Sequence, residues 1–473
     1  MKDTIIRISE ITINNFKNIA HSSISFDNQR KKYKASVLGL YGQNGSGKTA
    51  LIDCISLLKL LLSGNKVPQK FADYIMVSCE YSSIKYSFNI ECLNSQTSYF
   101  ATYELKMKKE LDTENLNLEN FNHMNPKYKV IIYDEVLSCS YCDLNEKNNF
   151  KPIIDTSKKS DYAFEPRNRF EGLIGKEKNV ISEVNAYKTI ALHTSRSFIF
   201  SKELLTSIRN NESGELKYKT LLEALIYYGN FGLFVFNTSN TGLISMNALP
   251  LSFRINEEKL GAIGNLTIKL DGTTLIPQEG IEIVKKVIKN MNIVLKQIIP
   301  GLVIDVYETG KEVLPNNLVG SRIHLVSKKD GTEIPLKYES EGIKKIISIL
   351  QLLIVLYNNS TITVAIDELD SGVFEYLLGE ILKIISEKGK GQLIFTSHNL
   401  RPLETIDKGF IAFTTTNSNN RYIRFSNVKT NNNLRDFYYR DIILGEQNEC
   451  VYEKTNNFEI ALAFKEAGEY IGS

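Results

Sequence analysis

Residues 42–49 read Gly-Gln-Asn-Gly-Ser-Gly-Lys-Thr and match the pattern G-x-x-x-x-G-K-[ST]. The glycines let the backbone fold back, so that several N–H groups can point at one anion. The ammonium group of Lys48 can reach the β- and γ-phosphates of a nucleotide, and the hydroxyl of Thr49 can ligate Mg²⁺. We therefore expect ATP to be bound by Gly42, Asn44, Gly45, Ser46, Gly47, Lys48 and Thr49.

Two carboxylates, Asp367 and Glu368, follow the apolar run TITVAI. A continuous β-branched run is typical of a buried parallel strand, and ligands bind at the carboxyl ends of such strands. At that position Asp367 can hold Mg²⁺, and Glu368 can act as the general base on the attacking water. Two carboxylates in a solvated turn are the alternative, but the apolar strand and the upstream phosphate loop favour catalysis.

Two further features could contact phosphate. Ser340 and Gly342 stand at the start of an apolar helix, whose N-terminus can present a second anion site. The alternative is an ordinary N-cap. His398 follows another apolar run, QLIFTS, and could hydrogen-bond the γ-phosphate or the attacking water.

The elements that would position these residues alternate between strands and helices. The sequence indicates a strand before Gly42, before Asp367 and before His398, and an apolar helix after the phosphate loop and after the acidic pair. This alternation predicts a mainly parallel sheet flanked by helices. Aromatic-rich alternating runs near 74–142 predict an antiparallel β subdomain. We expect an α/β P-loop fold with an N-terminal ATPase part at 1–155, a helical insert at 156–300, a C-terminal ATPase part at 301–430 and a tail at 431–473. The sequence has no heptad repeat of the length that a long coiled coil requires, so we expect none.

Composition limits the class of protein. The chain has 473 residues, 42% of them apolar and 23% charged, which is typical of a soluble protein of two or three domains. The net charge of +3 does not indicate a dedicated nucleic-acid binder. Several of the six cysteines lie in apolar runs and are read as buried reduced thiols, whereas Cys139 and Cys142 form a lone C-x-x-C. No signal peptide or membrane span is indicated, so we expect a cytoplasmic protein without membrane partners.

In order and spacing, GQNGSGKT, ESEGIKK, IDELDSG and FTSHNLRPLE resemble the motifs of the ATP-binding-cassette (ABC) ATPases. With INNFKNI, they look like the soluble branch that holds RecF, SMC, Rad50 and overcoming-lysogenization-defect (OLD) type ATPases. This resemblance covers about 1–155 and 300–430. It implies that each ATP lies between the phosphate loop of one subunit and the signature Ser340–Gly342 of another. The chain would then be at least a homodimer that closes on ATP and opens after hydrolysis by Glu368, with Lys48 and His398 also catalytic.

The sequence departs from the family pattern in two places. The family often has S-x-L-[DH] after the acidic pair, whereas this chain has Asp370-Ser371-Gly372-Val373-Phe374, so the resemblance does not extend to signalling between subunits through that loop. The glutamine that usually contacts Mg²⁺ is not evident, since Gln69 is too close to the phosphate loop. Arg196 is a candidate for an additional site residue.

Two functions stay open. The first, resembling the ATPase subunits of PARIS- or Septu-type systems, is a phage-defence sensor or scaffold that controls a separately encoded toxin or nuclease. The second is a RecF/SMC-like DNA-repair ATPase that clamps DNA. The near-neutral charge favours protein partners, so nucleic acid is allowed but not required. The absence of D-x-D and of a further histidine after His398 indicates no nuclease activity in the chain itself. A local basic surface or a solvated strand edge is indicated by Lys408, Arg421, Arg424 and Lys429.

Overall fold

The computed structural model describes residues 4–28, 35–112, 128–144, 146–211, 215–256, 261–313, 315, 318–425, 433–445 and 447–471. Two six-stranded sheets form its centre, one mainly parallel and one antiparallel. Helix α1 (Lys48–Leu62) contributes to the core that contains both the antiparallel sheet and one face of the parallel sheet. The α/β class and the combination of the two sheets are confirmed.

The parallel sheet carries the predicted motifs at its strand ends. Its order is β18-β17-β3-β16-β15-β8, and every neighbouring pair except β17–β18 is parallel. Strands β15 and β16 are buried along their whole length, as their continuous apolar runs predict. The strands are β3 (Ser36–Tyr41), β8 (Leu233–Phe236), β15 (Thr363–Ile366), β16 (Gln392–Thr396), β17 (Ile411–Thr414) and β18 (Tyr422–Ile423).

The antiparallel sheet has the order β2-β1-β4-β5-β6-β7. Its long strands alternate buried and exposed residues over much of their length, and the buried side chains pack toward α1 and the helices α2–α5. The strands are β1 (Thr4–Phe16), β2 (Ile19–Ser25), β4 (Tyr81–Cys92), β5 (Thr97–Leu111), β6 (Tyr128–Cys142) and β7 (Lys147–Asp155).

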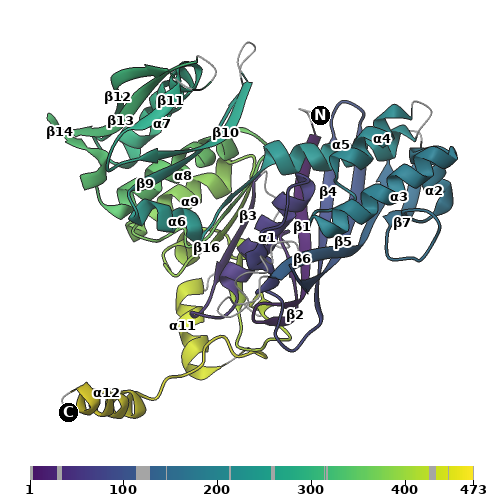
Figure 1. The fold of residues 1–473 in the computed structure, drawn as a ribbon. Coiled ribbons are helices and arrows are strands. Elements are labelled where there is room, and N and C mark those ends of the chain that lie inside the picture. Colours follow the sequence, from purple (N-terminus) through teal and green to yellow (C-terminus); the bar gives the residue numbers. More distant parts are fainter. Residues whose placement is uncertain are drawn as a thin grey trace.

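The expected helical insert at 156–300 is only partly helical. Its first half forms α2 (Arg167–Leu173), α3 (Lys178–His193), α4 (Lys202–Asn210) and α5 (Leu216–Tyr227), which lie over the antiparallel sheet in Figure 1. The chain then returns to the parallel sheet as β8, which pairs with β15. A short apolar run such as LFVF directly after a helix cannot be assigned to strand or helix by periodicity alone, because it is too short to show either period.

A further lobe follows β8 and packs against the other face of the parallel sheet. It contains a two-stranded ribbon, a small antiparallel sheet and helices, and one apolar core joins these elements to that face of the parallel sheet. Its elements are α6 (Thr238–Ser245), β9 (Ala248–Asn256), β10 (Gly261–Lys269), β11 (Thr274–Pro277), α7 (Gln278–Ile298), β12 (Val303–Val313), β13 (Val319–Lys329), β14 (Thr332–Pro335), α8 (Glu341–Asn358) and α9 (Glu375–Lys388).

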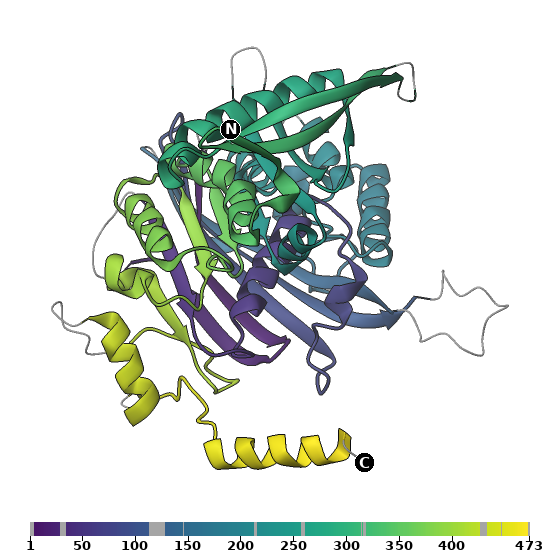
Figure 2. The same cartoon turned by 90° about the vertical axis from the view of Figure 1, so that its left-hand side faces the viewer.

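The C-terminal part contains α10 (Pro402–Thr405), α11 (Leu434–Leu444) and α12 (Asn457–Ile471). Figure 2 shows α12 apart from the rest of the molecule, joined to it by an extended segment. The proposed domain boundary at 430 lies outside the described residues. Among the helices that the structure describes, none combines the length and the apolar character that a membrane span requires.

Candidate functional site

The phosphate loop connects β3 to α1 in the conformation that its glycines permit. Gly45 and Gly47 have φ values of +77° and +98°, in the left-handed region that favours glycine. A Cβ atom on Gly42 would overlap the side chain of Thr414 on β17. The ammonium group of Lys48 donates hydrogen bonds of 2.8 Å to the carbonyl oxygens of Gly42 and Gln43, so it lies folded over the loop.

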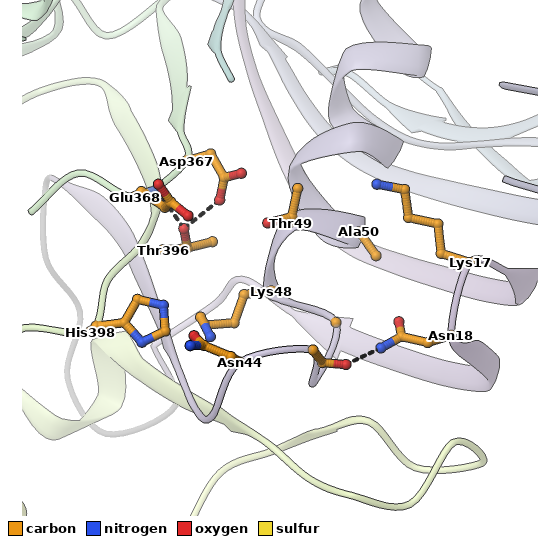
Figure 3. A pocket seen from close by; sticks show the side chains of 12 residues that line it. Lys17, Asn18, Asn44, Lys48, Thr49, Ala50, Asp367, Glu368, Thr396 and His398 are labelled. Carbon is orange, nitrogen blue, oxygen red and sulfur yellow. Dashed lines mark hydrogen bonds between the residues drawn. The ribbon is translucent and has the colours of Figure 1, made fainter. Parts of the chain in front are cut away.

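A cavity of about 250 Å³ opens beside this loop. Figure 3 shows the acidic pair and His398 on one side of it, facing the loop and residues 17–18. Of the predicted ATP-binding residues, the lining includes Asn44, Gly45, Gly47, Lys48 and Thr49. Gly42 and Ser46 are not in the lining. Ser46 supports the loop from within, because its hydroxyl donates to the carbonyl oxygen of Gln43 and contacts Thr414.

The acidic pair is held by Thr396, which was not predicted from the sequence. The Thr396 hydroxyl donates to Oδ1 of Asp367 at 2.6 Å and accepts the backbone N–H of Glu368 at 2.8 Å. Within the described part of the chain, the buried Oδ2 of Asp367 has no hydrogen-bond partner. Glu368 adopts a φ of +47°, an uncommon conformation for a residue with a side chain. The Asp367 carboxylate is therefore held in place while one of its oxygens lacks a hydrogen bond. The neighbouring residue Glu368, which lines the cavity, has a strained backbone.

His398 is positioned by Asp370, two residues after the acidic pair. Oδ2 of Asp370 accepts the backbone N–H groups of His398 and Asn399 at 3.0 and 2.9 Å. Burial and the nearby Lys48 lower the pKa of His398 from its ordinary value, so the neutral imidazole is favoured at pH 7. Asp370, where the sequence departs from the family pattern, thus holds the backbone of the His398 loop within the same chain.

Two buried lysines face the acidic residues. Burial lowers the pKa of Lys48 to about 8, and the charge of Asp367 opposes this shift. Burial likewise lowers the pKa of Lys345 to about 8, with Glu368 as its main opposing charge. The Lys345 ammonium donates to Thr241 Oγ1 at 2.9 Å and to the Asp367 carbonyl oxygen at 3.5 Å. A lysine inside the apolar pattern of GIKKIISILQLL was the only sequence signal for this residue.

The predicted signature residues do not line this cavity. Ser340 is the N-cap of α8, and its hydroxyl accepts the backbone N–H of Ile343 at 3.3 Å. Gly342 packs on Gly372, whose carbonyl oxygen would overlap a Cβ atom at position 342. The cap that the sequence left as the alternative is therefore present in the single chain.

Residues 17–18 complete the cavity on the side of the antiparallel sheet. Lys17 forms an ion pair with Asp53 of α1, and its ammonium lies 4.1 Å from the ring centre of Tyr74. Asn18 donates to the carbonyl oxygen of Gly45. These residues lie in the INNFKNI stretch, which was noted for its resemblance but not assigned to the site.

The remaining candidates do not join the cavity. Arg196 lies exposed after α3. Arg421 donates to the carbonyl oxygens of Asn18 and Thr415, and Arg424 donates to those of Ser25 and Ile411, so both are structural. Lys429 lies outside the described residues.

The C-x-x-C pair shows no sign of a metal site. Cys139 is buried on β6, whereas Cys142 is exposed at the end of that strand. Among the described residues, no group of three or more His, Cys, Asp and Glu side chains is arranged to hold a metal.

Comparison with known families gives one match. Residues 7–401 match the model of the AAA ATPase domain, which is most of the chain. The matched range begins before the phosphate loop and ends after His398, so it includes every residue that lines the cavity. No curated protein matches the sequence.

The solved structures with similarity to the chain have low sequence identity to it. An SMC head bound to the C-terminal winged-helix domain of ScpA has 12% identity and a TM-score of 0.41, with 89% of this chain and 98% of that chain covered. The SMC head domain from Thermotoga maritima has 14% identity and a TM-score of 0.37, with 89% and 99% covered. The recombination mediator protein RecF-ATPrS of the RecFOR pathway has 12% identity and a TM-score of 0.36, with 88% and 98% covered.

Proposed function

The chain belongs to the AAA ATPase domain family and is an ATPase, and we propose that two copies of it close around ATP as an ABC-type switch. The observation that carries this proposal is the division of the motifs. The phosphate loop, Asp367, Glu368 and His398 line one cavity, whereas Ser340 and Gly342 do not. A second copy can supply the N-terminus of its α8 to the exposed side of the phosphates, where backbone N–H groups and the helix dipole favour an anion.

Each of three cavity residues would have its own role in the hydrolysis of ATP. Lys48 would leave the loop carbonyls for the β- and γ-phosphate oxygens, whose charge it offsets. Glu368 would accept a proton from the water that attacks the γ-phosphorus, while the bond to the bridging oxygen breaks and ADP leaves. Neutral His398 can hydrogen-bond the γ-phosphate or hold that water in line.

A magnesium ion fits the same residues. The unpartnered Oδ2 of Asp367 and the hydroxyl of Thr49 are oxygen ligands of the kind that Mg²⁺ prefers, and both residues line the cavity. The ion would supply charge neutralisation of the phosphates. Thr396 holds the Asp367 carboxylate in one orientation toward that position.

We assign this switch to an anti-phage defence system, as a sensor or scaffold that controls a separately encoded toxin or nuclease. The support is the resemblance of the motif set to such ATPases and a net charge of only +3. Arg421 and Arg424 are occupied by backbone carbonyl groups. That observation removes two of the four residues of the candidate basic surface, from which the alternative, a DNA-clamping repair ATPase, would draw its phosphate contacts. Co-purification of a neighbouring gene product and binding to gapped DNA across salt concentrations would separate the two.

The closing step is tested with the Glu368→Gln variant, which keeps the size of the side chain but removes the general base. We expect it to form a dimer or larger assembly when ATP is added, measured by light scattering. Glu375→Gln, an exposed substitution at the start of α9, is the matched control and should behave as the unchanged chain. Adding Lys48→Ala to the Glu368→Gln protein should abolish assembly. A Glu368→Gln protein that binds ATP and stays monomeric would refute the closing model.

A further inference from the structure

Helix α12 carries apolar side chains that its own chain does not cover. Phe458 and Phe464 are 76% and 77% exposed, and Ile460 and Leu462 are also exposed. All residues from 457 to 468 are exposed, and Figure 2 shows the helix apart from the main body. Ile460 and Phe464 lie one turn apart on one side of the helix, and Phe458 and Leu462 lie on the other side. Exposed apolar side chains that lie together in this way mark an interaction site in soluble proteins.

A partner would stabilise the helical form of α12. The helix has 15 residues, and isolated helices of about 12–15 residues are only marginally stable in water. Most helical stability in proteins comes from packing of an apolar face rather than from intrinsic propensity. The surface that covers α12 therefore contributes to its folding.

The segment that precedes α12 is tied to the phosphate loop. The backbone N–H of Glu453 donates to Oε1 of Gln43, the second residue of that loop, at 2.7 Å. The tail is held a second time where Thr416 donates its N–H to the carbonyl oxygen of Cys450 at 2.8 Å. Helix α12 begins four residues after Glu453 (457 − 453), a reach of about 14 Å for extended chain. The helix therefore begins within about 14 Å of the residue that is bonded to the phosphate loop.

The same chain has an apolar groove with the character of a helix receptor. It lies between α7, α8 and α9 and has a volume of about 340 Å³. Its lining is almost entirely aliphatic, and one lining residue, Ile384, is 51% exposed. Grooves of this type take the apolar face of an amphipathic helix. Other lining residues are Val294, Ile298, Leu350, Leu353 and Ile381.

We propose that α12 of one copy packs into the α7–α8–α9 groove of a second copy. This inference rests on the proposed function, in which the phosphate loop of one copy faces Ser340 of the other. The groove begins at Leu350, ten residues after Ser340 (350 − 340). Ten residues correspond to about 15 Å along helix α8. A helix of 15 residues is about 22 Å long, so α12 is long enough to span the distance from the partner's Ser340 to the groove. A two-fold axis would make the exchange reciprocal.

Disulfide trapping between two differently substituted chains tests the contact. One chain carries Phe464→Cys and the other Ile384→Cys, both in a Glu368→Gln background with the exposed Cys142 and Cys450 changed to Ser. We expect the mixture to give a covalent dimer on mild oxidation in ATP, whereas each chain alone gives none. The control replaces Ile384→Cys by Val77→Cys, which is fully exposed on the antiparallel lobe and should not cross-link to residue 464.

The outcomes separate this inference from the proposed function. An ATP-dependent dimer that forms without the 464–384 disulfide would overturn the docking of α12 and leave the closing model intact. Loss of both the dimer and the disulfide would count against both. If both substitutions were placed in one chain and the disulfide formed only within that chain, the exchange between copies would also be overturned. A disulfide from residue 464 to residue 77 in equal yield would overturn it as well.

A second variant tests the energetics without cysteines. Phe464→Asp places a charge on the side of α12 that carries Ile460 and Phe464 and should weaken the ATP-held dimer by about tenfold or more. Val77→Asp is the matched control on an equally exposed position. Because neither side chain is buried, both variants should keep the thermal stability of the monomer. Unchanged dimer affinity in Phe464→Asp would contradict the proposal.

Discussion

Gly342 at the start of α8 packs directly against the backbone of Gly372 in the loop after the acidic pair. Gly372 itself has a φ of +72°, and its carbonyl oxygen points to the place where a Cβ atom on residue 342 would lie. The glycine of the signature thus has a structural requirement inside one chain, in addition to any role toward a nucleotide. This contact also links the signature helix to Asp370, which holds the His398 loop.

Gly342→Ala should therefore destabilise the chain without any nucleotide present. The added methyl group meets backbone atoms that cannot rotate away, and overpacking of this kind costs about 1–3 kcal/mol. Ser340→Ala removes an N-cap and should cost about 1 kcal/mol. Thermal unfolding of the nucleotide-free proteins checks both. A Gly342→Ala melting temperature equal to that of the unchanged chain would show that the loop containing Gly372 can move aside. For ATP-dependent closing, Ser340→Ala is therefore the cleaner signature variant.

Replacing Thr396 by Val should impair both the fold and the site. Val keeps the shape of the side chain but leaves Oδ1 of Asp367 and the N–H of Glu368 without their shared partner. The unsatisfied buried groups should cost about 1–3 kcal/mol, and the Mg²⁺ concentration for half-maximal ATPase activity should rise. Thr396→Ser is the matched control, because it keeps the hydroxyl. If the Val and Ser variants needed the same Mg²⁺ concentration, Thr396 would have no part in orienting the carboxylate.

Features that depend on a short stretch of chain could be predicted from the sequence alone. The phosphate loop, the strand before Asp367 and the position of His398 each follow from a short pattern whose flanking periodicity is unambiguous. Their meeting in one cavity follows from the geometry of parallel strands, whose carboxyl ends share an edge of the sheet. The resemblance to a known family supplied the roles but not the contacts.

Features that depend on tertiary contacts could not be predicted. The hydrogen bond from Glu453 to Gln43 joins residues 410 positions apart, and neither residue type suggests the other. The four-residue strand β8 was missed because its edge position in the sheet is set by pairing with β15. Lys345 reads as a charge on the edge of an apolar helix, and only the packing of α6 beside α8 shows that its ammonium is buried.

Lys345→Met should change the pH dependence of stability. The pKa of Lys345 is lowered to about 8 in the folded chain, compared with about 10.4 for an unperturbed lysine. Between these values the unfolded chain binds more protons than the folded one, so this lysine makes stability rise with pH across that interval. The Met variant lacks that contribution. Its stability relative to the unchanged chain should therefore be highest near pH 7 and fall as the pH rises toward about 10.

Urea unfolding of both proteins at several values between about pH 7 and 9.5 measures this difference, and titrations common to the two chains cancel. Lys344→Met on the neighbouring residue is the control, because the Lys344 ammonium donates to the carbonyl oxygen of Lys337 instead of that of Asp367. A difference between Lys345→Met and the unchanged chain that stayed constant over this range would mean that Lys345 is not the buried cation described here. ATPase activity measured in parallel would show whether its hydrogen bond to Asp367 supports catalysis.

ATP affinity should be highest below about pH 8 and decrease above it because of Lys48. Without nucleotide, burial lowers the pKa of Lys48 to about 8, and phosphate oxygens placed beside the ammonium would raise it by favouring the charged form. Binding then takes up a proton above that pH, so affinity should fall by up to about tenfold per pH unit there. Titration of a fluorescent ATP analogue between about pH 7 and 9.5 measures this slope.

Lys48→Arg provides the decisive control for that slope. A guanidinium stays charged over the whole range, so the variant should bind more weakly at about pH 7 but show little further loss at about pH 9.5. The comparison is best made in the Lys345→Met background, because Lys345 has a similar pKa and lies near the same carboxylates. If the unchanged protein and the Lys48→Arg variant lost affinity with the same slope, that slope could not arise from titration of the side chain at position 48. Parallel curves for the two proteins would therefore place the titrating group elsewhere and leave Lys48 as a permanently charged phosphate ligand.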